Sequence, residues 1–189
     1  MANVGHMFVR GRRMAGVWAV AAVALALTTA CTPDAAPTPS PSPTGFASEE
    51  EAFAAAEETY RAYVDALNQV DLSDPETFEP VFALTTGSLL EQEKKQLSQF
   101  HAEGARVSGD SALTLIVLRS WDRLTGAVVV AACVDVTQVQ VVDAEGNSLV
   151  SADRPDFQRT LATLFPGDTP TGLHLDSIDG REGAPECGV

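Results

Sequence analysis

The stretch Gly126 to Asp143, GAVVVAACVDVTQVQVVD, decides the expected fold. It is rich in β-branched valine and, at eighteen residues, is about three times as long as a typical strand. Its first apolar positions alternate: Val128, Val130, Ala132, Val134 and Val136. After two polar residues the apolar positions shift to Val139 and Val141, and an inserted bulge residue produces such a change of parity. The stretch therefore predicts the long, bent central strand of a curved sheet.

Three helices are predicted before the first strand. Capping boxes of the form Ser-x-x-Glu open the first and the third, at Ser48 and Ser88, and an Asp-Pro pair opens the second at Asp74. The predicted ranges are 48–70, a short piece from 74 to about 80, and 88–104. In the first helix Tyr60 and Tyr63 are assigned to the core, the alternative being a pair that stacks on a ligand.

Alternating patterns of apolar residues follow the helices. Besides the central stretch, strands are predicted at 106–107, 111–121, 157–165 and 172–178. Turn signals separate them at 122–126, 144–147 and 166–170. Helices followed by an antiparallel meander are typical of the α+β class.

The first 30 residues are predicted to be a signal peptide rather than part of the fold. Three arginines precede an apolar run, 14–26, that is too short for an ordinary membrane-spanning helix. The segment ends in Ala30-Cys31, which resembles a bacterial lipobox, whose cysteine is acylated, as by palmitate, and becomes the mature N-terminus. The prediction is a lipoprotein anchored through Cys31. An ordinary cleaved secretory signal and a retained anchor are the alternatives.

Residues 31–45 are rich in proline, serine and threonine and are predicted to be a linker. Proline favours the extended polyproline II conformation, so this segment is expected to act as a spacer roughly 40 Å long. A folded domain is expected over residues 46–189, with enough chain for a core of its own. The anchor and the linker together predict a domain at the extracytoplasmic face of the cell membrane, with the membrane as a partner.

The chain after the leader is strongly acidic. All 26 acidic residues follow position 31, with only 9 of the 12 basic residues, which gives this part a net charge of −17. Nucleic-acid binding depends on clustered cations, so the composition argues against a nucleic-acid partner. The charge predicts a solvated surface, with binding of a cationic partner as the alternative.

Once Cys31 is assigned to the lipid, two cysteines remain, Cys133 and Cys187. An even pair in an exported chain predicts a disulfide, which would tie the C-terminal tail to the central strand. The alternative is two free thiols, with Cys133 a small buried residue of the core.

Several short motifs carry a resemblance to a known family. They are Ala56-Glu-Glu-Thr-Tyr60, Leu84-Thr-Thr-Gly-Ser88, Ala132-Cys133-Val134-Asp135, Val142-Asp143-Ala-Glu-Gly146 and the C-terminal Cys187. With these motifs the chain resembles NTF2-like domains, the cone-shaped fold also used by ketosteroid isomerase and the SnoaL polyketide cyclases. In particular, it resembles the domain found in exported lipoproteins of high-GC Gram-positive bacteria. The resemblance implies three N-terminal helices packed on a curved antiparallel sheet, and it raises a homodimer through the open sheet face as one form of the protein.

The resemblance also implies where a catalytic group would lie, since isomerases and cyclases of this fold place an aspartate or a histidine inside the cone. A carboxyl group in an apolar pocket has a raised pKa and can shuttle protons. The candidates are Asp135, Asp65, His101 and His174. Asp135 and Cys133 are two positions apart on the predicted strand, so their side chains point to the same face of the sheet. Asp135 can serve as a catalytic acid only if this face is the concave one. These residues are predicted to be structural or solvated, with Asp135 as the one weak catalytic candidate.

Other catalytic patterns are missing from the sequence. It has no nucleophile elbow, no phosphate-binding glycine loop and no metal-type spacing of cysteine or histidine, so neither a cofactor nor a metal is expected. The sequence predicts a non-catalytic binding or accessory module of the cell envelope, which would have an envelope protein as its partner. The alternatives are a carrier of a small apolar ligand and an isomerase or cyclase that uses Asp135.

Overall fold

A computed structural model describes residues 45–188, all within the compact unit Pro41–Val189. The predicted signal peptide, the lipidated Cys31 and nearly all of the predicted linker lie outside the described residues. The helices are α1 (Glu49–Asn68), the 3-10 helix η1 (Pro75–Phe78), α2 (Glu79–Ala83) and α3 (Gly87–Ala102). The strands are β1 (Arg106–Ser108), β2 (Ala112–Trp121), β3 (Val128–Asp135), β4 (Gln140–Val142), β5 (Phe157–Pro166) and β6 (Leu173–Gly180). Among these described helices, none has the length and apolar character needed to cross a membrane.

The predicted signals at the starts of the first two helices are seen in the structure. The Ser48 hydroxyl accepts a hydrogen bond from the Glu51 backbone N–H, and the Glu51 carboxylate accepts one from the backbone N–H of Ala47. At the second start, the Asp74 carboxylate accepts from the backbone N–H of Glu76. Local hydrogen bonding therefore sets where α1 and η1 begin.

The predicted N-cap of the third helix, Ser88, is wrong by two residues, and its capping box does not form. Thr86 is the N-cap of α3, without a side-chain cap, and the Ser88 hydroxyl donates instead to the backbone oxygen of Asp176 on β6. A Cβ on Gly87 would lie only 2.0 Å from a carboxylate oxygen of Asp176, and Gly87 has a φ of +53°. Close approach to β6 therefore decides how α3 begins.

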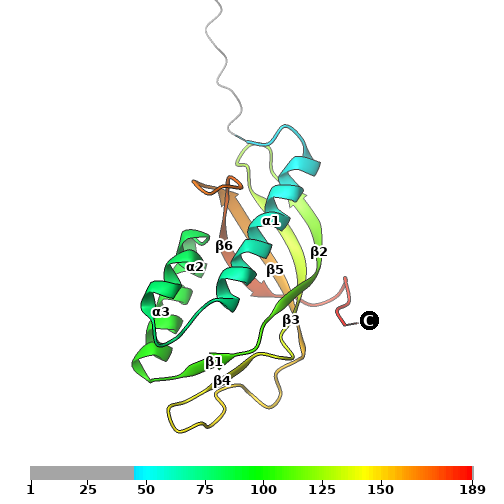
Figure 1. Cartoon of the computed structure of the whole chain (residues 1–189). Coiled ribbons are helices and arrows are strands. Elements are labelled where there is room, and N and C mark those ends of the chain that lie inside the picture. Colours follow the sequence, from blue (N-terminus) through cyan, green and yellow to red (C-terminus); the bar gives the residue numbers. More distant parts are fainter. Residues whose placement is uncertain (1–44, 189) are drawn as a thin grey trace, which may run out of the picture. The chain divides into compact units, whose positions relative to one another are not determined.

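The strands form two antiparallel sheets. The larger has the order β2-β3-β5-β6, and β1 pairs with β4 in a separate two-stranded ribbon. Figure 1 shows α1 across one face of the larger sheet, α3 beside β6 with α2 packed on α1 and α3, and the ribbon of β1 and β4 below. The predicted α+β class is confirmed, and three α-helices with antiparallel sheets are compatible with an NTF2-like fold.

The prediction of one long strand from residue 126 to 143 is wrong. The stretch divides into β3 and β4, which belong to different sheets. The Asp135 carboxylate accepts hydrogen bonds from both the backbone N–H and the hydroxyl of Thr137, and the Val139 N–H donates to the Val136 oxygen. This tight turn ends the ladder at the place where the change of parity suggested a bulge.

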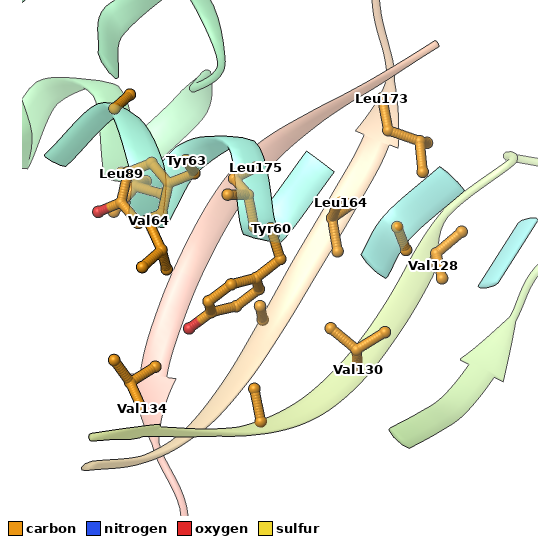
Figure 2. Close-up of a cluster of buried hydrophobic side chains, with 14 of the residues drawn as sticks. Tyr60, Tyr63, Val64, Leu89, Val128, Val130, Val134, Leu164, Leu173 and Leu175 are labelled. Atoms are coloured by element: carbon orange, nitrogen blue, oxygen red, sulfur yellow. The ribbon is translucent and has the colours of Figure 1, made fainter. Parts of the chain in front are cut away.

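The core lies between α1 and the larger sheet. One of the two alternating faces of β3 is buried in this core, with Val128, Val130 and Ala132 fully covered and Val134 nearly so, as is Val136 directly after the strand. Figure 2 shows side chains of α1 pointing onto the sheet, where they meet leucines of β5 and β6. The fully or nearly fully buried partners are Ala52, Ala56, Tyr60, Val64, Leu164, Leu173 and Leu175.

The C-terminal tail is fixed to the opposite face of the sheet. In the structure Cys133 of β3 and Cys187 form a disulfide, with 5.6 Å between their Cα atoms. The Arg159 guanidinium lies 2.7 Å from the Glu186 carboxylate, and Arg119 donates to the backbone oxygen of Ala184. A covalent bond and polar contacts thus hold the tail against β2, β3 and β5.

We expect Cys187→Ser to lower the free energy of unfolding by up to about 4 kcal/mol, because the disulfide closes a loop of 54 residues. Urea denaturation of residues 46–189 measures this change. Reductant should weaken the wild-type domain by a similar amount and leave the variant unaffected. Equal stability of the two proteins without reductant would show that the disulfide contributes nothing.

Candidate functional site: a cavity between two helices and the sheet

A cavity of about 490 Å³ lies beside the core. Its walls come from the C-terminal half of α1, from α3, from both sheets and from the segment 149–151 with Arg154. Most of the lining is apolar, as shown by Val64, Leu67, Val134, Val136, Val141 and Ile178. The alternation of β3 explains this lining, since Val134 and Val136 continue the inward face of the strand past the packed core.

Two tyrosines of α1 contribute buried polar groups to the cavity. Tyr60 and Tyr63 are three residues apart and so lie on one side of the helix, with their rings edge to face at a centroid distance of 6.2 Å. The Tyr60 hydroxyl is hydrogen bonded to the Thr160 hydroxyl of β5 at 3.0 Å. The Tyr63 hydroxyl donates to the carboxylate of Glu93 on α3. Each hydroxyl therefore links α1 to a different element of the cavity wall.

The environment changes the acidity of these groups. Burial raises the pKa of Glu93, although the hydrogen bond from Tyr63 opposes this change. Burial and the neighbouring Glu93 carboxylate raise the pKa of Tyr63, and burial raises that of Tyr60. Both tyrosines therefore stay neutral, and Glu93 holds a proton more tightly than an ordinary carboxyl group does.

Arg154 organises another part of the cavity wall. One nitrogen of its guanidinium donates to the backbone oxygens of Val136 and Val139, each at 2.8 Å. These two oxygens belong to the turn between β3 and β4, so the arginine connects that turn to the segment 149–154. The guanidinium donates to backbone oxygens that have no partner in a β-ladder, because β3 has already ended at this point.

Asp135 does not lie in the cavity. Its neighbours Val134 and Val136 line the cavity, and Asp135 points to the other face of β3, where Cys133 also lies. The two hydrogen bonds from Thr137 lower the pKa of Asp135, which is the opposite of the raised pKa expected for a proton-shuttling group in an apolar pocket. The geometry therefore removes the support for Asp135 as the catalytic acid.

The other predicted candidates are also outside the cavity lining. Asp65 is exposed on α1. A ring nitrogen of His101 lies 2.8 Å from the Leu72 backbone oxygen, which fixes the end of α3. His174 lies against Gly167 so closely that a Cβ there would be 1.8 Å from its ring. Residues 45–188 contain no group of three or more His, Cys, Asp or Glu that could hold a metal ion.

Glu93 is a functional candidate that the sequence did not predict. It lies in the polar run Glu91 to Lys95, which has the composition of an exposed helix face. In the structure Glu93 is half-buried against α1, whereas Glu91, Lys94 and Lys95 are exposed. The spacing of Leu89, Leu97 and Phe100 could have indicated this, because position 93 lies on the same side of the helix as Leu89 and Leu97.

Comparison with known proteins yields likenesses of structure only. No family model and no curated protein matches the chain. The intermembrane-space region of the chloroplast protein ARC6 has 14% identity and a TM-score of 0.46, over 66% of this chain and 92% of that one. A proposed aromatic ring hydroxylase from Novosphingobium aromaticivorans has 13% identity and a TM-score of 0.45, over 70% and 94%. Aln2 from a Streptomyces species has 14% identity and a TM-score of 0.41, over 69% and 90%.

We expect Glu93→Gln to change how stability depends on pH. Because the pKa of Glu93 is raised in the folded protein, the folded state binds this proton more tightly than the unfolded chain does. Its contribution to stability is therefore present below the ordinary carboxyl pKa and is lost as the pH rises through the folded pKa. Glutamine accepts the same bond from Tyr63 without titrating, so the variant should gain stability relative to wild type as the pH rises from about 4 upward.

Urea midpoints measured across this range test the expectation. Glu91→Gln removes the same charge from the exposed side of α3 and is the matched control. If the wild-type and Glu93→Gln curves run parallel, Glu93 is not held in the environment described above.

Proposed function

We propose that the domain is a non-catalytic binding module whose cavity receives a small, largely apolar molecule. One observation carries the proposal: a cavity of about 490 Å³ with mostly apolar walls and a few buried polar groups. Its volume is within the range of small-molecule sites, which are typically apolar with a small number of orienting polar groups. The Tyr60–Thr160 and Tyr63–Glu93 pairs would supply that orientation.

The family assignment belongs to the same proposal. The order of elements, helices first and antiparallel strands after them, supports an NTF2-like domain from residue 46 onward. An isomerase or cyclase reaction at Asp135 is not part of the proposal, because this carboxylate faces away from the cavity. Fold alone licenses no activity, so the cavity and its lining are the basis of the function.

The location of the domain is proposed from the leader and the linker. Acylation of Cys31 would hold the chain at the extracytoplasmic face of the cell membrane, with residues 31–45 as the spacer. From this position the cavity would meet molecules outside the cytoplasm. The acylation of Cys31 is supported by the apolar run of the leader and the Ala30-Cys31 pair that follows it.

We expect Val141→Trp to abolish binding of the neutral fluorescent probe N-phenyl-1-naphthylamine. Val141 lines the cavity, and a larger side chain there would occupy the space that the probe needs. Val142, the next residue of β4, is equally half-buried but does not line the cavity, so Val142→Trp is the matched control. Fluorescence titration of residues 46–189 measures binding, and circular dichroism checks that each variant is folded.

Two outcomes would contradict the proposal. One is that the wild-type domain binds no apolar probe, which would leave the outer surface, and so an envelope protein partner, as the functional part. The other is that both tryptophan variants bind the probe as wild type does, which would place the probe elsewhere on the protein.

The anchor is tested with the full chain expressed in a high-GC Gram-positive host. We expect the wild-type protein to fractionate with membranes and to carry an acylated Cys31 at its N-terminus, seen by mass spectrometry of the N-terminal peptide. Cys31→Ser should remove the lipid and release the protein from the membrane fraction. A wild-type N-terminus at a residue other than Cys31 would show an ordinary secretory signal instead.

A further inference from the structure

Two charged side chains line the cavity within the described residues, Glu93 and Arg154. Arg154 already has partners, since one of its nitrogens donates to the oxygens of Val136 and Val139. These two hydrogen bonds close the turn between β3 and β4 and fix the position of the Arg154 side chain. The arginine is therefore part of the wall, and its charge is compensated by the carbonyl groups that it contacts.

Glu93 has a different environment. One carboxylate oxygen accepts the hydrogen bond from Tyr63, and a phenol is a neutral donor. Within residues 45–188 the salt bridges are Arg61–Glu57 and Arg159–Glu186, so none of them compensates Glu93. A carboxylate that is withdrawn from water without a cationic partner is destabilised, as the raised pKa of Glu93 reflects.

The surroundings of Glu93 would also favour a cation that carries an apolar body. The aromatic rings of Tyr60, Tyr63 and Phe100 line the same cavity, as do the aliphatic side chains named above. Aromatic faces attract ammonium groups, and aliphatic walls take up the rest of the molecule. The net negative charge of the domain would attract such a ligand from a distance.

We infer that the ligand of the cavity is an amphiphilic amine, with its ammonium group paired to Glu93 and its apolar body against the valines and leucines of α1 and β3. This inference rests on the proposed function and adds the chemical class of the ligand. The Tyr63 hydroxyl holds the carboxylate toward α1, and the ammonium group would bind the carboxylate from the cavity. The ligand thus supplies the cation that the protein leaves out.

Three probes with the same naphthyl group and substituents of similar size test the inference: 1-naphthylmethylamine, the neutral 1-naphthalenemethanol and the anionic 1-naphthoate. Each competes with N-phenyl-1-naphthylamine for residues 46–189 at neutral pH, where the alkylamine is protonated. A hydrogen bond between charged groups predicts that the amine binds about tenfold or more tightly than the alcohol. Glu93→Gln should remove this preference, because the glutamine amide carries no negative charge that could pair with the ammonium group.

Glu91→Gln is the control for the general effect of charge, since it removes an exposed carboxylate from the same helix. It should leave the preference for the amine intact. Equal affinities for the amine and the alcohol, or tighter binding of the naphthoate, would overturn the inference while the proposed cavity binding stands. If N-phenyl-1-naphthylamine itself does not bind, the proposed function fails, and the inference fails with it.

Discussion

Burial of the inward face of β3 against α1 is the interaction on which the rest of the structure depends. In the first half of α1 the contacts are small: Ala52 and Ala56 are fully buried and let the helix approach the sheet closely. In the second half Tyr60 and Tyr63 take their place, and these long side chains reach Thr160 and Glu93. The packing is therefore dense at one end of the helix and leaves the cavity at the other.

The sequence predicted most of this frame because the frame depends on local signals. The cap at Ser48 and the cap at Asp74 are hydrogen bonds between residues at most three positions apart. The alternation along β3 is likewise a property of neighbouring residues. The prediction for the start of α3 failed because a distant contact decides it, the close approach of Gly87 to β6. The break after β3 is a local feature that the alternation of apolar residues did not reveal, because it follows from the turn that Asp135 forms with Thr137.

The cavity was harder to predict because Glu93, the carboxylate in its wall, looks like an ordinary surface residue in the sequence. Glu93 belongs to a run of charged residues, and only contact with Tyr63 on a separate helix distinguishes it from Glu91. Asp135 shows the reverse case. Its parity with Cys133 was visible in the sequence, but which layer faces the cavity depended on the position of α1, which strand alternation does not supply.

A crystal structure of residues 46–189 with bound 1-naphthylmethylamine would test the central claim most directly. The account predicts that the naphthyl group lies in the cavity between α1, α3 and β3, with its nitrogen within hydrogen-bonding distance of the Glu93 carboxylate. A cavity filled by the protein's own side chains, with the probe bound on the outer face of the sheet or not at all, would contradict it.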